Sequence, residues 1–336
     1  MKNMKMRLVF VFVALMLVVT TVTGSANAAD KQRIVCLAPS CVEVIYALGM
    51  QDSLVGWSQY TDYPPEVTYT RGWVPYYEYQ FISVEDELSK EVAVVSGFID
   101  YNREVIDALD PTLIIATESI QKGMADELAA AGYNVLYQNP TTLDEVFQAM
   151  IEVGTATGTE SKARKLVKGY YAEIKEIEAI TKGLPRISVY MEISHYGPWA
   201  TGAGSPMDQI IEIAGGSNIF ADIPYSAFPT TNADIVTRNP DVILTPLWPK
   251  AGPYEVTTVS EIVMREGYQS ITAVMNDRVY HYDSSLFKRP GPRQVTAIRK
   301  MAYLLHPYYF KNPENSVSPW ELGKIDAYYD PPAPLR

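Results

Sequence analysis

Two arginines near the end of the chain are suited to recognising anionic groups. Arg289 and Arg293 flank the prolines of "RPGPR", shortly after a predicted strand. A guanidinium group binds carboxylate or phosphate oxygens through paired hydrogen bonds, and catecholate oxygens offer the same geometry. We therefore predict that both arginines contact a ligand that carries such groups.

Aromatic residues are abundant, with 24 tyrosines, 9 phenylalanines and 5 tryptophans. Several follow the C-terminal ends of predicted strands, where open α/β sheets hold their ligands. These residues are Trp57, Tyr60, Phe98, Tyr196, Trp199 and Trp248. Their clustering predicts an aromatic-walled cleft for a large, flat or apolar ligand. For any single tyrosine, the alternative is that the ring covers the core and the hydroxyl meets water.

One unit occurs twice, as "NREVIDALDPTLIIAT" at 102–117 and as "NADIVTRNPDVILT" at 232–245. In each copy a polar residue and an acid open a short helix, a proline ends it, and an apolar strand follows. Asn102 is a good N-cap, which places Glu104 in the first turn, where the helix dipole favours an acid. The repetition indicates two lobes of similar construction.

Enzyme signatures are missing from the sequence. There is no G-x-S-x-G elbow, P-loop or HExxH motif, and the three histidines all lie in the second half of the chain. A secreted hydrolase with His195 or His281 as base is one alternative, without a nucleophile motif to support it. Direct binding of ferric iron by tyrosinates is another. We predict no catalytic residues and no metal-ligating residues.

Short apolar strands alternate with helices along most of the chain, which is typical of parallel sheets covered on both faces. Residues 143–184 interrupt this alternation with two helices, the second of about 22 residues and roughly 33 Å. This stiff strut would connect an N-terminal α/β lobe at 29–142 to a C-terminal α/β lobe and tail at 185–336. Residues 71–91 form an aromatic and acidic insertion with one predicted short helix.

The first 28 residues have the pattern of a secretory signal peptide. Three basic residues precede an apolar run at 8–19, and Ala26 and Ala28 supply the small residues of a cleavage site. The run is too short to span a bilayer. No cysteine stands at the cleavage point, so we expect a secreted, periplasmic or cell-surface protein without a lipid anchor.

The charge and the cysteines of the exported chain limit its partners and its chemistry. Removing three basic residues with the signal leaves 25 basic against 39 acidic residues, a net charge of −14. Such a chain repels phosphate backbones, so nucleic acid is excluded as a partner. Cys36 and Cys41 lie close enough to bridge, but we favour two unpaired, buried residues under the first helix.

Several motifs together resemble the iron-siderophore and vitamin B12 family of ABC-transporter substrate-binding proteins. They are "RIVCLAPSCVEVIYALGMQDSLVGWSQYTDYPPEV", "EVIDALDPTLII", "GPWATGAGSPMDQIIEIAGGSNIFAD" and "RPGPR", which occur in the family's order. The resemblance runs from about Arg33 to Pro307. It implies two Rossmann-like lobes with parallel sheets joined by a single long helix, the class III periplasmic-binding-protein fold. It also implies a monomer that delivers its ligand to an ABC transporter permease dimer with cytoplasmic ATPases.

The resemblance also implies that one acid from each lobe docks on the permease. In lobe one, this acid stands seven residues before a proline, as Glu104 does before Pro111. In lobe two, the same spacing gives Ala233, and Asp234 follows one residue later. We predict that Asp234 is the second docking acid, with Asp222 as the alternative.

Family members that bind corrinoids line the cleft with aromatic residues. The matching positions here are Tyr60, Phe98, Trp199 and Phe228, with an arginine at Arg289. The resemblance therefore implies a metal chelate as cargo and no cofactor of the protein's own. The aromatic residues are compatible with cobalamin or haem, and the two arginines with a ferric siderophore. We favour a corrinoid.

Overall fold

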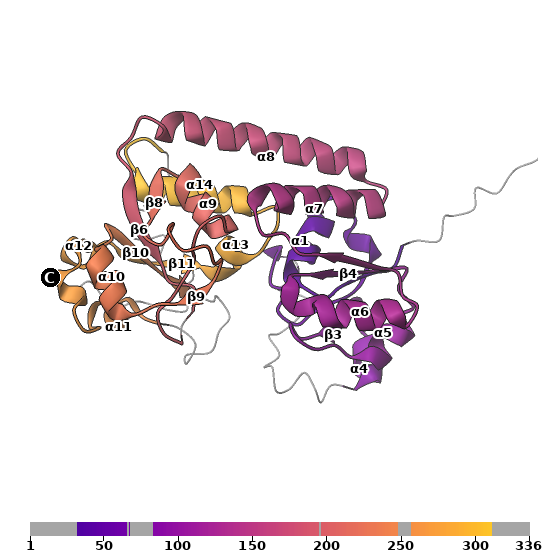
Figure 1. Cartoon of the computed structure of the whole chain (residues 1–336). Coiled ribbons are helices and arrows are strands. Elements are labelled where there is room, and N and C mark those ends of the chain that lie inside the picture. The colour runs from indigo at the N-terminus through magenta and orange to yellow at the C-terminus, as the bar shows by residue number, and fades with distance from the viewer. Residues whose placement is uncertain (1–31, 66, 68–82, 195, 248–256, 311–336) are drawn as a thin grey trace, which may run out of the picture. The chain divides into compact units, whose positions relative to one another are not determined.

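The computed structural model describes residues 32–65, 67, 83–194, 196–247 and 257–310 (Figure 1). The predicted signal peptide, most of the 71–91 insertion, Trp248 and His195 lie outside the described residues. Within the described ranges, no helix is both long enough and apolar enough to cross a membrane.

The first lobe is a five-stranded parallel sheet with the strand order β3-β2-β1-β4-β5. Its strands are β1 (Ile34–Cys36), β2 (Leu54–Ser58), β3 (Ala93–Ser96), β4 (Leu113–Thr117) and β5 (Val135–Gln138). Its helices are α1 (Pro39–Ala47), α4 (Val84–Leu88), α5 (Arg103–Leu109) and α6 (Lys122–Ala130), with 3-10 turns η1 (Gln51–Ser53) and η2 (Ser119–Gln121). The central strands β1 and β4 are fully buried because helices cover both faces of the sheet.

The second lobe contains a four-stranded parallel sheet with the order β11-β10-β6-β8 and a small antiparallel pair, β7-β9. The strands are β6 (Ile187–Met191), β7 (Trp199–Ala200), β8 (Gly216–Asn218), β9 (Phe228–Pro229), β10 (Val242–Leu247) and β11 (Val279–Asp283). The helices are α9 (Pro206–Ile213), α10 (Asn232–Arg238), α11 (Val259–Val263), α12 (Thr272–Met275), α13 (Ser284–Lys288) and α14 (Gln294–Leu305), with the 3-10 turn η3 (Tyr268–Ser270).

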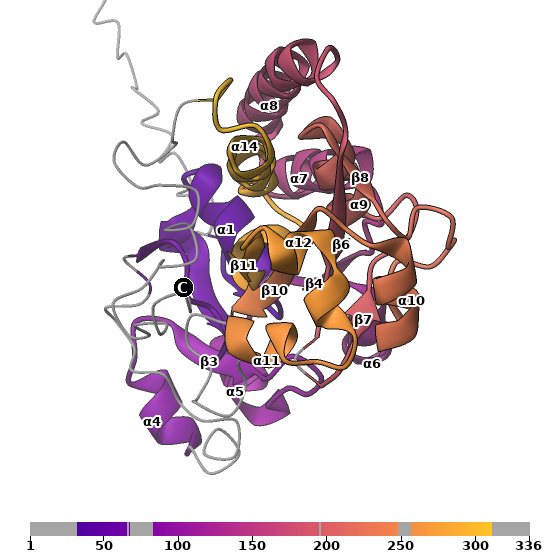
Figure 2. The same cartoon turned by 90° about the vertical axis from the view of Figure 1, so that its left-hand side faces the viewer.

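Two helices connect the lobes, α7 (Leu143–Ala156) and α8 (Glu160–Thr181). Thr142 caps the start of α7, because its hydroxyl oxygen accepts a hydrogen bond from the backbone amide of Glu145. Helix α8 lies alongside α7 and α14 in both views (Figures 1 and 2). An ion pair between Arg299 and Glu173 ties α14 to α8. The strut that the sequence predicts is therefore α8, and its ends reach both lobes.

A single apolar cluster runs through both lobes and the connecting helices. It contains Ile34 and Ile115 of lobe one, Phe147 and Ile174 of the connecting helices, and Leu244 of lobe two. Because buried side chains are continuous across the connection, α7 and α8 pack as part of the core. The fold class predicted from the sequence is confirmed, whereas the residue boundaries of the domains stay a prediction.

The two cysteines are paired in the structure. Cys36 at the end of β1 and Cys41 in the first turns of α1 form a disulfide, with their Cα atoms 5.6 Å apart. Our favoured interpretation of two unpaired residues is therefore wrong. Both side chains are buried, as expected, and burial alone does not distinguish a thiol pair from a bridge.

Candidate functional site

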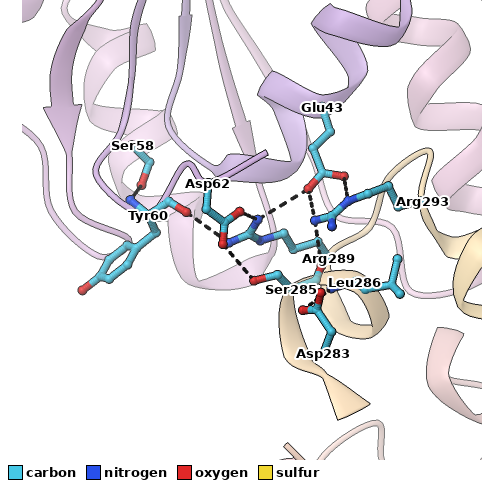
Figure 3. A network of polar contacts seen from close by, with 9 residues as sticks. All are labelled: Glu43, Ser58, Tyr60, Asp62, Asp283, Ser285, Leu286, Arg289 and Arg293. Atoms are coloured by element: carbon cyan, nitrogen blue, oxygen red, sulfur yellow. Dashed lines mark hydrogen bonds and ion pairs between the residues drawn. The ribbon is translucent and has the colours of Figure 1, made fainter. Parts of the chain in front are cut away.

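A buried ion pair joins the two lobes beside the C-terminal ends of their strands. Arg293, at the start of α14, donates to both carboxylate oxygens of Glu43 on α1, from Nε at 2.8 Å and from Nη2 at 2.5 Å (Figure 3). Burial raises the pKa of the Glu43 carboxyl, while the hydrogen bond and the charge of Arg293 favour its ionised form. The pair fixes the start of α14 against α1.

Arg289 makes a second connection between the lobes. Its guanidinium group forms an ion pair with Asp62 and donates to the backbone oxygen of Tyr60 at 3.0 Å (Figure 3). Ser285 of α13 donates to the other oxygen of Asp62 at 3.1 Å. The loop after β2 is therefore held against lobe two by charged and neutral hydrogen bonds.

The structure places both predicted arginines at the interlobe face, but lobe-one acids already engage them. Their side chains are only 13% and 15% exposed, and Glu43 and Asp62 balance their charges. The sequence did not indicate Glu43 or Asp62, because both acids look like ordinary helix and loop residues. A role for the arginines in contacting ligand stays a prediction.

The predicted aromatic residues lie at the strand ends of both lobes. Tyr60 follows β2 and Phe98 follows the adjacent strand β3, and the tyrosine ring is 37% exposed. In lobe two, Trp199 and Phe228 belong to the antiparallel pair β7-β9, where Phe228 is opposite Ala200. Trp199 is 39% exposed, and Phe228 is half-buried against Phe220 with ring centroids 5.4 Å apart.

Other predicted aromatic positions differ in exposure. Tyr196 is 81% exposed, and its backbone amide donates to the hydroxyl of Ser194 at 3.1 Å. Trp57 lies inside β2 and is buried, so it is a core residue rather than a residue after the strand. Trp248 is outside the described residues.

One residue at the interlobe face was missed by sequence reasoning. Glu118 follows β4 directly, is half-buried, and adopts a left-handed backbone with φ 72°. Burial raises the pKa of its carboxyl to about 7, while the charges of Lys288 and Arg289 from lobe two act in the opposite direction. An acid immediately after a buried strand was the available signal.

The two copies of the repeated unit fold alike. Helices α5 and α10 both have seven residues, begin at a capping side chain, and end at a left-handed residue, Asp110 or Asn239. Asn102 caps α5, as predicted, and Thr231 caps α10. Glu104 is therefore the second helical residue of its copy, whereas Asp234 is the third.

Both candidate docking acids are exposed, but their surroundings differ. No described residue pairs with the carboxylate of Glu104, whereas Asp234 accepts a hydrogen bond from the hydroxyl of Thr231 at 2.7 Å. Asp222 is held by Arg238 through two hydrogen bonds of 2.7 and 2.8 Å. Asp222, the alternative docking acid of lobe two, is therefore already paired with an arginine of its own lobe.

Of the two histidines proposed as a catalytic base, only His281 lies within the described residues. His281 on β11 is half-buried, and burial lowers the pKa of its imidazole, while a hydrogen bond with the backbone of Thr245 acts in the opposite direction. Among the residues that the structure describes, no three His, Cys, Asp or Glu side chains gather as a possible metal site.

Comparisons with known proteins agree on one family. The family profile described as periplasmic binding protein matches residues 34–286. An uncharacterised ABC transporter substrate-binding lipoprotein of Bacillus subtilis is 31% identical, with 84% of this chain and 82% of the relative covered. The cobalamin-binding protein of Halobacterium salinarum is 26% identical, with 82% and 70% covered.

A similar fold occurs among solved structures. The periplasmic haem-binding protein of Vibrio cholerae superposes with a TM-score of 0.67 at 18% identity, covering 82% of this chain and 100% of that one. At this identity the similarity shows the fold alone. It supports two α/β lobes connected by a long helix.

Proposed function

This chain belongs to the periplasmic binding protein family, and from that premise we propose that it captures a metal chelate between its lobes and delivers it to an ABC importer. The matched relatives are named as binding proteins rather than enzymes, which removes support from the hydrolase alternative. A relative named as a cobalamin-binding protein supports a metal chelate as the class of cargo.

The charges at the interlobe face favour one class of chelate over another. Arg289 and Arg293 are already paired with Asp62 and Glu43, so a polyanionic ferric siderophore would have to displace buried carboxylates. The partly exposed rings of Tyr60 and Trp199 instead offer apolar faces to a ligand. We therefore propose a corrinoid such as cobalamin as cargo, contacted by Tyr60, Phe98, Trp199 and Phe228.

Cargo titration tests this proposal directly. The mature protein is titrated with cyanocobalamin, haem and a ferric catecholate, while intrinsic tryptophan fluorescence is followed. We expect cyanocobalamin to bind with a Kd below about 10 μM, equivalent to roughly −7 kcal/mol, and more tightly than the ferric catecholate. Failure of all three to bind at that level would refute capture of a chelate.

A pair of aromatic variants locates the site. We expect Trp199→Ala to weaken cyanocobalamin binding by about tenfold, because a stacked aromatic ring contributes on the order of 1–2 kcal/mol. Tyr308→Ala is the matched control, since Tyr308 is 91% exposed beyond the end of α14, far along the chain from the strand ends. Equal losses in the two variants would place the cargo elsewhere.

Delivery requires an importer and export of the chain. The signal peptide at residues 1–28 lies outside the described residues, and we propose that it directs the chain across the membrane. We infer that Glu104 and Asp234 then contact the permease dimer, one from each lobe. Their exposure at the starts of two equivalent helices supports this role.

A further inference from the structure

Glu118 is an acid whose environment lacks the usual compensation. It is half-buried at the interlobe face, and no described residue donates a hydrogen bond to its carboxylate. By contrast, Glu43 and Asp62 are held by arginines of lobe two. A poorly hydrated carboxylate without a partner is costly, and such groups concentrate at functional sites.

The backbone at Glu118 is also strained. Its φ of 72° and ψ of 149° lie in a region that is almost restricted to glycine. The surrounding structure enforces this conformation through two backbone hydrogen bonds. The amide of Glu118 donates to the backbone oxygen of Gln138 at 2.9 Å, and the carbonyl oxygen of Glu118 accepts a hydrogen bond from the amide of Gln121 at 3.0 Å. Strain of this kind in residues other than glycine is concentrated at functional sites.

A buried glutamine positions this turn among the strand ends. The side-chain nitrogen of Gln121 donates hydrogen bonds to the backbone oxygens of Leu37, at 3.0 Å, and Phe98, at 3.1 Å. The side-chain oxygen of Gln121 accepts a hydrogen bond from the backbone amide of Thr117 at 3.0 Å. The ends of β1, β3 and β4 are therefore joined at one point. Glu118 is one residue beyond Thr117 at that junction, and the same glutamine holds the backbone of Phe98, a proposed cargo contact.

The two cations that act on Glu118, Lys288 and Arg289, make their own contacts with other groups. Lys288 donates to the backbone oxygen of Ile193 at 3.0 Å, and Arg289 is held by Asp62 and Tyr60. Both cations favour the ionised form of Glu118 from a distance without forming an ion pair with it. The adjoining turn η2 and the end of β5 place Ser119, Gln121 and Gln138 next to Glu118, and none of these side chains titrates.

We propose that Glu118 is a specificity-determining residue whose carboxylate accepts a hydrogen bond from a neutral N–H donor on the cargo, such as a peripheral carboxamide. This inference rests on the proposed function, and it states which chelates the site would prefer. An amide supplies the missing donor without adding charge, whereas a carboxylate-bearing chelate, such as haem with its propionates, would meet Glu118 with like charge.

Recognition through a carboxylate has a consequence for protons. The free carboxyl has a pKa of about 7, so near neutral pH it is partly protonated. A donor from the cargo stabilises the ionised form and lowers this pKa, so binding releases protons. Cargo affinity therefore rises as the pH increases through 7.

The experiment compares the wild type with Glu118→Ala and Glu118→Gln in calorimetric titrations with cyanocobalamin at pH 6, 7 and 8. Repeating each titration in buffers with different ionisation enthalpies counts the protons released. We expect Glu118→Ala to bind about 10- to 100-fold more weakly at pH 8. We expect Glu118→Gln to lose both the pH dependence and the proton release, because an amide does not titrate in this range.

Two comparisons and a check of folding complete the experiment. Glu91→Gln is the control, since Glu91 is an exposed acid of the same lobe that precedes β3 at the other end of the strand. We expect the wild type to reject the cyanocobalamin monocarboxylic acid whose altered group meets Glu118, and Glu118→Gln to accept it. Circular dichroism confirms that each variant is folded.

The two proposals fail in different ways. If the wild type binds cyanocobalamin but both Glu118 variants match its affinity, pH dependence and proton release, the role of Glu118 is refuted and chelate capture stands. If the wild type binds no corrinoid at all, the proposed cargo is wrong, and the inference about Glu118 falls with it.

Discussion

Arg293 holds both carboxylate oxygens of Glu43, and the two residues come from opposite lobes. The acid is 1% exposed and the arginine 15% exposed, so water screens their attraction weakly. Charged groups in such a site stabilise the fold only while both are present, because a lone buried charge has lost its hydration without compensation. The pair therefore makes the lobes depend on one another for stability.

Removing one partner of this pair should destabilise the protein strongly. We expect Arg293→Met to lower the free energy of unfolding by about 3 kcal/mol, because it leaves the buried Glu43 with only the longer contact to Arg289, at 3.5 Å. The double variant Glu43→Leu/Arg293→Met should lose less than the sum of the two single changes. Urea denaturation of the four proteins measures the coupling.

An exposed pair provides the control for this cycle. Arg103 and Asp107 form an ion pair at 2.8 Å, but their side chains are 45% and 51% exposed. We expect Arg103→Met to leave the free energy of unfolding almost unchanged, because water screens an exposed ion pair. If Arg293→Met were equally mild, the interlobe pair would contribute nothing beyond a surface contact.

The raised pKa of Glu118 predicts how stability depends on pH. Its carboxyl titrates at about 7 in the folded protein and near 4.5 in the unfolded chain, so between these values the folded state binds more protons. The contribution of Glu118 to stability is therefore lost as pH rises through this window. We expect Glu118→Gln to raise the free energy of unfolding at pH 8 by about 1–3 kcal/mol.

The same variant should have little effect at low pH. At pH 4.5 the folded-state carboxyl is protonated and resembles the neutral amide of glutamine in charge. Guanidinium denaturation at pH 4.5 and 8 separates the two cases. A variant that is equally stabilised at both values would owe its gain to relieved strain or packing rather than to ionisation.

The disulfide between Cys36 and Cys41 should contribute modestly to stability. It closes a short loop of five residues in sequence separation, for which chain entropy gives about 2 kcal/mol. We expect Cys36→Ala/Cys41→Ala to lower the free energy of unfolding by roughly this amount, plus the cost of lost buried volume. Dithiothreitol should destabilise the wild type and leave the double variant unchanged.

The longer elements could be predicted from the sequence because their patterns are strong. Short apolar runs predicted β1 and β4, and the long second helix predicted within 143–184 is α8, over residues 160–181. The two-residue strands β7 and β9 were missed, because a pair so short has no periodicity to detect. Their pairing depends on the loop around them.

The candidate site was predicted only in part. Arg289 and the aromatic residues were identified by type and position, but their partners were not, because Glu43 and Arg293 are 250 residues apart in sequence. Glu118 was missed for a related reason. Its burial and its neighbours Lys288 and Arg289 arise only when the two lobes meet.

The acid in the first copy of the repeated unit, Glu104, is predicted to dock on the importer. We expect Glu104→Ala to raise the protein concentration needed for half-maximal stimulation of the importer's ATPase by on the order of tenfold, because the permease would lose one of the two acids that dock on it. Cyanocobalamin affinity should be unchanged. Glu176→Ala is the control, since Glu176 is an exposed acid on α8.

The second copy allows a sharper test of position. Ala233 occupies the second helical residue of α10, equivalent to Glu104 in α5, while Asp234 occupies the third and bonds to Thr231. If Asp234 docks from the third position, Asp234→Ala alone should stimulate poorly. Ala233→Glu/Asp234→Ala should then restore stimulation, because its acid stands at the position that Glu104 occupies in α5. Wild-type stimulation by Asp234→Ala would show instead that lobe two docks without this acid.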